Sequence, residues 1–281
     1  MTADPRAPLT AFVLGGGGVL GACEVGMLQA LVDEGVRPDL VVGTSIGALN
    51  GAFVAADPSA GGVARLAQLW QDMTEGGLLS GSLIQRAGTL ARTRTHLHAY
   101  PPLRDLLRAA LPVQRIEDLA VPFQCVAASV ERAAEHWFRT GPLAEAVLAS
   151  CAVPGLFAPV RIDGEHFLDG GLVHSIPVGR AVALGATTIY VLQVGRVEQP
   201  LRPARRPWEV GLVAFEIARR HRYASDMAAV PDGVLVHVLP TGEPVPRYDE
   251  RAALRYRDFS AVGRRVEGAR AASAAYLAQR R

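Results

Sequence analysis

Apolar residues along the first part of the chain alternate between short continuous runs and helical stripes. Residues 9–14 form a largely apolar run that ends in glycines, which predicts a buried strand. In residues 22–35, apolar side chains recur every three or four positions up to a glycine, which predicts a helix. Residues 39–43 and 45–57 repeat the strand and the helix. This alternation predicts a parallel sheet with right-handed crossovers.

The rest of the chain continues the alternation less regularly. Strands are predicted at 121–130, 135–140, 187–194 and 233–239, a helix at 142–150, and a hairpin at 158–171 that turns at Asp163-Gly164. The pattern over residues 58–111 is helical but irregular, and 80–100 is the candidate for a mobile lid. We therefore expect the α/β class, as a three-layer α/β/α sandwich with a mostly parallel central sheet.

Nothing in the composition divides the chain. No proline-, serine- or charge-rich linker interrupts residues 1–281, so we expect one domain. Its motif-bearing core spans about 9–189, and further strands and helices follow over about 190–281.

Charge narrows the possible chemistry. The formal net charge is +2, and all 29 basic residues are arginine. Without a lysine amine, Schiff-base chemistry and Ser–Lys dyads are excluded. A charge this close to neutral gives no argument for a nucleic-acid partner.

The three cysteines, Cys23, Cys125 and Cys151, stand in apolar surroundings without metal-ligand spacing. They predict buried thiols in a reducing compartment, and we expect neither a metal nor a cofactor. The first ten residues lack the basic and apolar segments of a signal peptide, and glycine or proline interrupts the long uncharged stretches. We expect a cytoplasmic protein without a transmembrane helix.

A serine occupies the junction between the second predicted strand and its helix. Gly43-Thr44-Ser45-Ile46-Gly47 follows the G-x-S-x-G pattern in the strand-to-helix context of a nucleophile elbow. Such a turn is so sharp that only small residues fit two positions before and after the serine. Serine is also common at helix starts for capping alone. The pattern therefore makes Ser45 a candidate nucleophile.

A glycine run follows the first predicted strand. Gly16, Gly18 and Gly21 match the G-x-G-x-x-G fingerprint of dinucleotide folds. That alternative requires an acidic residue at the end of the second strand, and none is present there. Neighbouring parallel strands would instead place the N–H groups of Gly16, Gly17 and Gly18 beside the serine, as an oxyanion hole that the N–H of Ile46 could complete.

The serine needs a base, and two kinds are available. In the order of an α/β-hydrolase triad, His174, His221 or His237 could complete a Ser–His–Asp arrangement after Asp169. However, Ser45 follows only two strands, and none of these histidines lies in an evident tight turn. Asp169 itself ends a predicted strand and precedes two glycines, which permit a sharp turn, although Asp-Gly also occurs in plain β-turns.

Three blocks in this order, "GGGGVLG", "GTSIG" and "DGG", resemble the patatin-like phospholipase family. The segment "SCAVPGLFAPV" is similar to the one that precedes the aspartate of that family, and the likeness covers about residues 9–189. The resemblance implies an acyl hydrolase with a Ser–Asp dyad, in which Ser45 is the nucleophile, Asp169 the base and Gly16 to Gly18 the oxyanion site. The supporting glycines of these motifs are Gly21, Gly43, Gly47, Gly170 and Gly171.

One position departs from that pattern. Many family members have a basic residue where this chain has Leu20, so a cation from the glycine loop is in doubt while the backbone N–H groups are unaffected. The substrate that the resemblance implies is a phospholipid or lysophospholipid. A small ester, a thioester, and a non-catalytic protein that keeps the elbow as a structural turn are the alternatives.

Residues 202–223 combine arginines at both ends with an apolar stretch that holds Trp208, Leu212 and Phe215. This pattern is typical of a segment that contacts anionic lipid at a membrane surface. It also fits an ordinary helix that packs against the core and leaves its arginines in solvent.

Overall fold

A computed structural model describes residues 8–75, 101–111, 113–194, 200–204, 206–242 and 261–280. An eight-stranded sheet runs through the molecule in the order β5-β6-β3-β2-β1-β7-β8, with β4 paired to β3 outside this path. The strands are β1 (Thr10–Leu14), β2 (Leu40–Thr44), β3 (Phe123–Ser129), β4 (Ala134–Phe138), β5 (Val160–Ile162), β6 (Glu165–Asp169), β7 (Thr188–Leu192) and β8 (Leu235–Val238).

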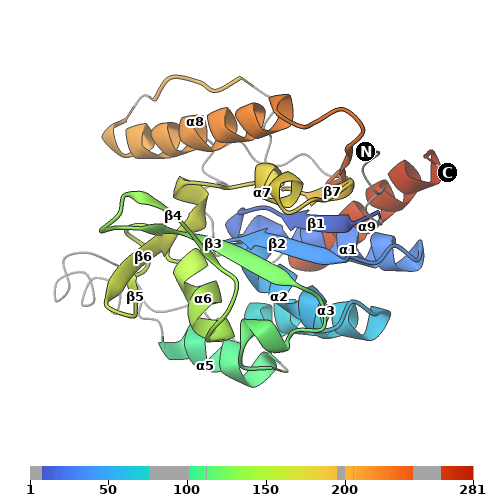
Figure 1. Cartoon of the computed structure of the whole chain (residues 1–281), viewed down its shortest axis with the longest axis horizontal. Helices are drawn as coiled ribbons and strands as arrows, with labels where there is room; N and C mark the ends of the chain where they lie inside the picture. Colours follow the sequence, from blue (N-terminus) through green and yellow to red (C-terminus); the bar gives the residue numbers. More distant parts are fainter. Residues whose placement is uncertain are drawn as a thin grey trace, which may run out of the picture.

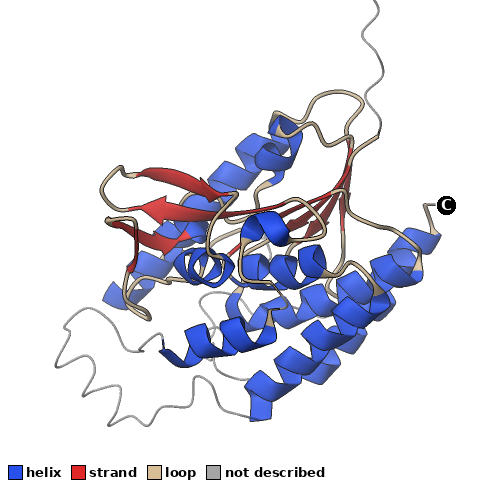
Figure 2. Ribbon diagram, turned by 60° about the horizontal axis from the view of Figure 1, so that its bottom comes forward, coloured by secondary structure: helices blue, strands red, loops and turns tan. Residues whose placement is uncertain are grey.

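Helices cover both faces of the sheet (Figures 1 and 2). On one face lie α1 (Ala22–Asp33), α2 (Ile46–Ala56), α3 (Ala60–Glu75), α5 (Pro101–Ala110), α6 (Leu143–Ser150) and α9 (Val262–Ala278). On the other face lie α7 (Val178–Ala183) and the long α8 (Pro207–Ala228). Short 3-10 turns, η1 (Gly18–Gly21), η2 (Ile116–Asp118) and η3 (Gly170–Leu172), complete the described elements.

Strand β1 shows how the sequence builds the three layers. Phe12 and Leu14 pack with the helices of the first face, whereas Ala11 and Val13 pack with those of the second. A strand buried on both faces needs apolar side chains at every position, which explains its continuous apolar run. The mixed α/β fold, with a central sheet between helices, is therefore confirmed.

Pairing is parallel among β1, β2, β3, β7 and β8, and antiparallel for β4, β5 and β6. The predicted hairpin is present and turns at Asp163 and Gly164, both at positive φ. The predicted lid, 80–100, lies outside the described residues.

Candidate active site

The turn between β2 and α2 holds Ser45 in a rare backbone conformation. Its φ and ψ are 54° and −125°, a region that a non-glycine residue adopts only when its surroundings enforce it. A Cβ at Gly43 would lie 2.5 Å from the carbonyl oxygen of Gly47, and one at Gly47 would lie 2.4 Å from that of Leu14. A Cβ would therefore collide at both positions, in agreement with a turn so sharp that only small residues fit beside the serine.

Strand pairing on β3 brings the serine and the aspartate together from 124 residues apart. The end of β2 pairs Thr44 with Val126, and the end of β6 pairs Asp169 with Ala127, the next residue of β3. The two strands thus run toward each other along one edge of β3 and stop where they meet. The Ser45 hydroxyl donates to Asp169 Oδ2 at 2.6 Å.

Burial controls the acidity of Asp169. The residue is 3% exposed, and its Oδ1 accepts the Gly171 N–H at 2.7 Å. Desolvation raises its pKa from the ordinary 3.8 to about 6, and the hydrogen bonds from Ser45 and Gly171 limit the rise. A carboxylate with a pKa near 6 is ionised at neutral pH and accepts a proton more readily than an ordinary aspartate.

Both glycines after the aspartate are required by close packing. A Cβ at Gly170 would lie 2.2 Å from the carbonyl oxygen of Val126. One at Gly171 would lie 2.9 Å from Asp169 Oδ1 and 2.9 Å from the Phe215 ring. The two glycines therefore let the chain turn tightly around the carboxyl group.

The glycine loop after β1 lies beside the serine, as expected from adjacent parallel strands. The position that a Cβ of Gly16 would occupy is 3.4 Å from Ser45 Cβ. However, the Gly16 N–H donates to the Ser175 carbonyl at 2.8 Å, so the expectation that it serves an oxyanion hole does not fit. The backbone hydrogen bonds found among the described residues include none donated by Gly17 or Gly18.

A buried polar cluster of Glu24, Asn50 and Trp70 is hydrogen-bonded to that loop. The Asn50 side-chain amide donates to the carbonyl of Gly21 at 3.0 Å and to Glu24 at 2.8 Å, and Trp70 donates to Asn50 at 2.9 Å. Complete burial raises the pKa of Glu24 well above its ordinary 4.5, and the hydrogen bond from Asn50 limits the rise. A Cβ at Gly21 would lie 2.7 Å from Ile46, which makes this glycine the contact between the loop and α2.

Sequence reasoning missed Ser150, a buried serine at the end of α6 that holds the elbow in place. The Ser45 N–H donates to Ser150 Oγ at 2.8 Å, and that hydroxyl donates to the Val126 carbonyl at 2.6 Å. This link ties the strained turn to both α6 and β3. Its only signal was its place at the start of the "SCAVPGLFAPV" segment.

The histidine triad has no support in the geometry. His174 Nε2 lies 2.5 Å from Glu135, and its Nδ1 lies 3.6 Å from Asp226. In the part of the chain that the structure describes, no hydrogen bond joins a histidine to Ser45 or Asp169. The serine hydroxyl is instead in direct contact with the carboxylate.

Cys151 lies beside the serine and the aspartate. Unlike the buried Cys23 and Cys125, it is half-buried, which corrects the expectation of three buried thiols. Burial raises the pKa of Cys151 well above its ordinary value, and the negative charge of Asp169 adds to the rise. The thiol therefore stays protonated, and only the thiolate is a strong nucleophile.

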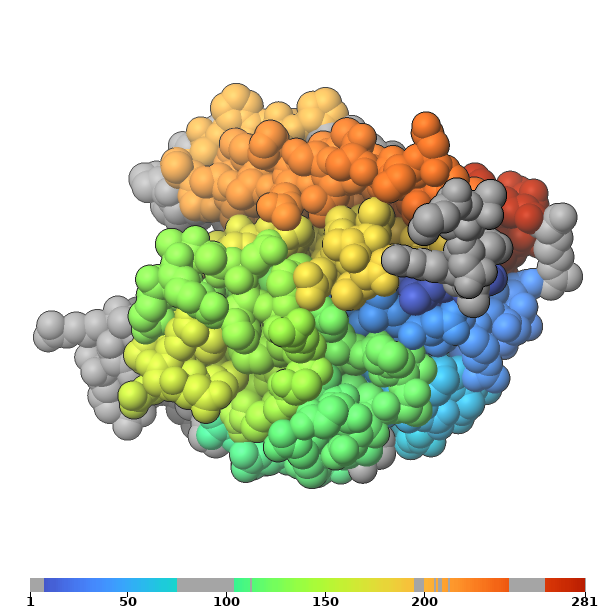
Figure 3. Space-filling model, viewed as in Figure 1, coloured from blue at the N-terminus to red at the C-terminus, as the bar shows by residue number. Residues whose placement is uncertain are grey.

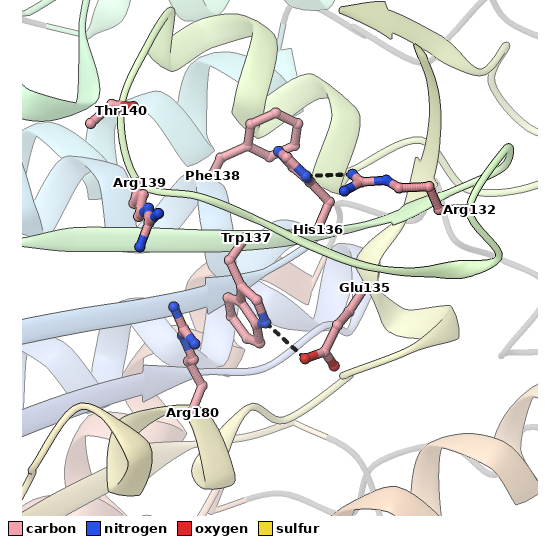
Figure 4. A pocket seen from close by; sticks show the side chains of 8 residues that line it. All are labelled: Arg132, Glu135, His136, Trp137, Phe138, Arg139, Thr140 and Arg180. Carbon is pink, nitrogen blue, oxygen red and sulfur yellow. Dashed lines mark hydrogen bonds between the residues drawn. The ribbon is translucent and has the colours of Figure 1, made fainter.

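One cavity among the described residues lies elsewhere, along the edge strand β4. It measures about 420 Å³ and is lined by Trp137, Arg180 and six other residues (Figure 4), and neither Ser45 nor Asp169 is among them. Within the same residues, no group of three or more acidic, histidine or cysteine side chains is arranged to hold a metal ion. No helix in the described ranges combines the length and the apolar run needed to cross a bilayer.

The chain is similar to a solved structure at low sequence identity. VipD from Legionella pneumophila matches with a TM-score of 0.47 at 15% identity, over 97% of this chain and 67% of that one.

Comparison with curated proteins finds longer relatives. Patatin-like phospholipase domain-containing protein 6 of Mus musculus is 31% identical over 192 residues, which cover 67% of this chain and 14% of the mouse protein. An uncharacterized NTE family protein of Mycobacterium tuberculosis is 31% identical over 201 residues, or 70% of this chain and 52% of that protein. The chain thus matches only about one seventh of the first of these relatives and half of the second.

A family comparison covers the part of the chain that builds the site. The family model for patatin-like phospholipases matches residues 12–182, a range that includes the glycine loop, the elbow and Asp169. This match spans more than half of the 281 residues. The chain therefore belongs to the patatin-like phospholipase family.

Proposed function

We propose that this protein is a lipid acyl hydrolase that cleaves carboxylic esters through a Ser45–Asp169 dyad. The observation that carries the proposal is the 2.6 Å contact between Ser45 Oγ and Asp169 Oδ2. The strained elbow that presents the hydroxyl and the raised pKa of the carboxyl support the same roles. Membership of the family supports lipid esters as the substrate class.

In the first half of the reaction, Ser45 Oγ attacks the ester carbonyl carbon while its proton passes to Asp169 Oδ2. The tetrahedral oxyanion receives hydrogen bonds from the N–H groups of Gly17 and Gly18, and the positive end of α2 faces it. The C–O bond of the ester then breaks. The leaving alcohol takes the proton from Asp169, and the acyl group remains on Ser45.

In the second half, water attacks the acyl-enzyme and gives a proton to Asp169. The Ser45 Oγ–carbon bond breaks, the fatty acid leaves, and the proton returns to Ser45. Asp169 therefore serves as base and then as acid in each half, a role that suits a pKa near neutrality. No histidine, metal or cofactor takes part in these steps.

A fluorophosphonate probe tests this proposal because it reacts only with an activated serine. We expect a single adduct, mapped by peptide mass spectrometry to Ser45 and lost in Ser45→Ala. Ser225→Ala, which changes an exposed serine on α8, is the matched control and should label like the wild type. An adduct at another residue, or none on folded protein while a known serine hydrolase labels alongside, would contradict the proposal.

Contact with a membrane surface is the second part of the proposal. Helix α8 forms an outer layer of the molecule (Figure 3), and its residues Val210 and Ile217 are 57% and 55% exposed. Large apolar side chains between arginine-rich ends suit an anionic lipid surface. We expect Val210→Asp/Ile217→Asp to weaken co-sedimentation with phosphatidylglycerol vesicles, whereas Val130→Asp, at a similarly exposed valine off this helix, should not. Absence of wild-type binding would rule out this part.

A further inference from the structure

A buried arginine on α8 contacts the loop that follows the aspartate. The Arg219 side chain is 5% exposed, and Arg219 is the only buried arginine among the described residues. Its Nε donates to the Ser175 hydroxyl at 2.7 Å. Arg219 also lies beyond residue 182, where the family match ends. A guanidinium is withdrawn from water in this way only where it has a defined partner.

Ser175 connects that arginine to the glycine loop. Its carbonyl accepts the Gly16 N–H at 2.8 Å, the bond that removes Gly16 from the candidate oxyanion donors. Its Oγ lies 3.4 Å from the position that a Gly16 Cβ would occupy, and Ser45 Cβ lies 3.4 Å from the same position. Gly16 is therefore held between the serine of the dyad and the residue that Arg219 fixes.

The charge of Arg219 is only partly neutralised. Glu216 lies 3.6 Å from Arg219 Nη1 and 3.2 Å from Arg220 Nε, so one carboxylate is shared between two guanidinium groups. Burial lowers the pKa of Arg219, which reflects the free energy spent on desolvating it. The Ser175 hydroxyl is thus held by a charged donor, and such bonds are stronger than neutral ones.

Helix α8 touches the other half of the site as well. Phe215, one helical turn before Arg219, lies against Gly171, whose N–H donates to Asp169. One face of α8 therefore contacts both the loop that carries the base and the residue that anchors the glycine loop.

We propose that Arg219 is a positioning residue of the acyl-transfer site. By holding Ser175 against Gly16, it keeps the N–H groups of Gly17 and Gly18 directed at the oxyanion. This inference rests on the proposed function, because it assigns those N–H groups to the tetrahedral intermediate. It also makes a helix outside the family match part of the working site, at a place where Leu20 leaves the glycine loop without a cation of its own.

The test compares the rate of Ser45 labelling by a fluorophosphonate, and kcat and KM for a p-nitrophenyl ester, across five variants. They are Arg219→Met, Arg219→Lys, Ser175→Ala, the double variant Arg219→Met/Ser175→Ala, and Arg220→Gln. The last is the matched control, because it removes an arginine that shares Glu216 but does not contact Ser175. Since displacing reacting groups by about 1 Å can lower rates by about 10²-fold, we expect Arg219→Met to lose about 10- to 100-fold in kcat with little change in KM.

The combination of variants separates positioning from general structural support. If Arg219 acts through Ser175, Ser175→Ala loses a similar factor and the double variant loses no more than either single one. Arg219→Lys, which keeps a charged donor, should recover part of the rate. Wild-type rates in Arg219→Met, or losses in the double variant that multiply, would overturn the inference.

Two further outcomes are also decisive. If Arg219→Met does not fold, the Ser175→Ala variant decides the matter. A wild-type kcat in Ser175→Ala overturns the inference, and a lower kcat in folded Ser175→Ala supports it. Failure of the wild type itself to label at Ser45 would instead contradict the proposed function, so the two failures are distinguishable.

Discussion

The part of the chain that the family match covers and the part that follows it contribute differently to the site. Residues 12–182 supply Ser45, Asp169 and the glycine loop, where backbone atoms approach so closely that a single Cβ would collide. The later segment supplies α8, which packs against the turn after Asp169, and α9, which packs on α1. Such a close approach to α9 also occurs at Gly26 of α1, where a Cβ would lie 2.0 Å from the Val266 carbonyl.

This difference shows why three short motifs identify the family while the helices after them do not. An elbow, a tight turn after an aspartate and a loop in close contact with Val194 and Ile46 each require glycine at fixed positions. A packing helix requires only apolar side chains of suitable volume, which many sequences supply. Variants in the motifs of the first region should therefore change activity most, and variants at the contacts with α9 of the second should change stability most.

Asp169→Asn should have the largest effect on activity. An amide cannot accept the Ser45 proton, and loss of a general base lowers rates by about 10²–10⁴-fold. We expect kcat/KM for a p-nitrophenyl ester to fall by about 10³-fold, with the fold intact by circular dichroism. Asp163→Asn, the same change at the turn of the same hairpin, should leave the rate unchanged, because its side chain is exposed and far along the strand. Full activity in Asp169→Asn would exclude the dyad.

Gly17→Ala should have the next largest effect. The added Cβ would lie 2.1 Å from Val194 Cγ2, so the loop must move, whereas its φ of −174° suits any residue. Because loss of one oxyanion donor lowers rates by about 10²–10³-fold, we expect a fall of about 10²-fold in the rate of Ser45 labelling.

Two variants check the cause of that loss. Gly17→Ala/Val194→Ala removes the colliding methyl group and should recover part of the rate. Gly211→Ala adds a methyl group in open space on α8 and, made in the wild type, should leave the labelling rate unchanged. A Gly17→Ala enzyme that labels normally would mean that the glycine loop does not bind the oxyanion.

Gly26→Ala tests the contact between α1 and α9, the helix that lies beyond the family match. Its Cβ would collide with the backbone of α9, which has no freedom to rotate away, and overpacking of this kind costs about 1–3 kcal/mol. We expect a lower free energy of unfolding in urea but an unchanged labelling rate for each folded molecule. Loss of activity without loss of stability would erase the contrast between the two regions.

Local patterns were enough to predict most of the fold. The runs and stripes located the strands and helices from β1 to α2, and the hairpin turn at Asp163 followed from its Asp-Gly sequence. These features depend on neighbouring residues, so one sequence contains the information. The meeting of β2 and β6 on β3 depends on pairing between distant strands, and no periodicity encodes it.

The candidate site divides in the same way. Motifs located Ser45 and Asp169, and the structure places them in contact. Ser150, Ser175 and Arg219 were not found, because a lone serine or arginine has no spacing that marks its partner. The use of the Gly16 N–H by Ser175 was missed for the same reason.

Among the expected changes in the rate of Ser45 labelling, the change per pH unit should be the smallest. Because Asp169 accepts a proton only when ionised and its pKa is about 6, the labelling rate should be constant above that pH. Below it, the rate should fall about tenfold for each pH unit. A profile measured from pH 4 to pH 8 checks this, and a midpoint near the ordinary value for aspartate would mean that the carboxyl is not desolvated during the reaction.

Protonation of Asp169 cannot produce the acid limb of the rate profile by unfolding the protein. Its pKa is higher in the folded protein than the usual 3.8, so the folded state binds the proton more tightly. As the pH falls from 6 toward 4, protonation of this group therefore stabilises the fold while it removes activity. Wild-type stability should rise relative to Asp169→Asn over this range, as measured by urea unfolding at each pH. If it fell instead, the acid limb would report unfolding, and the assignment of the midpoint to Asp169 would be wrong.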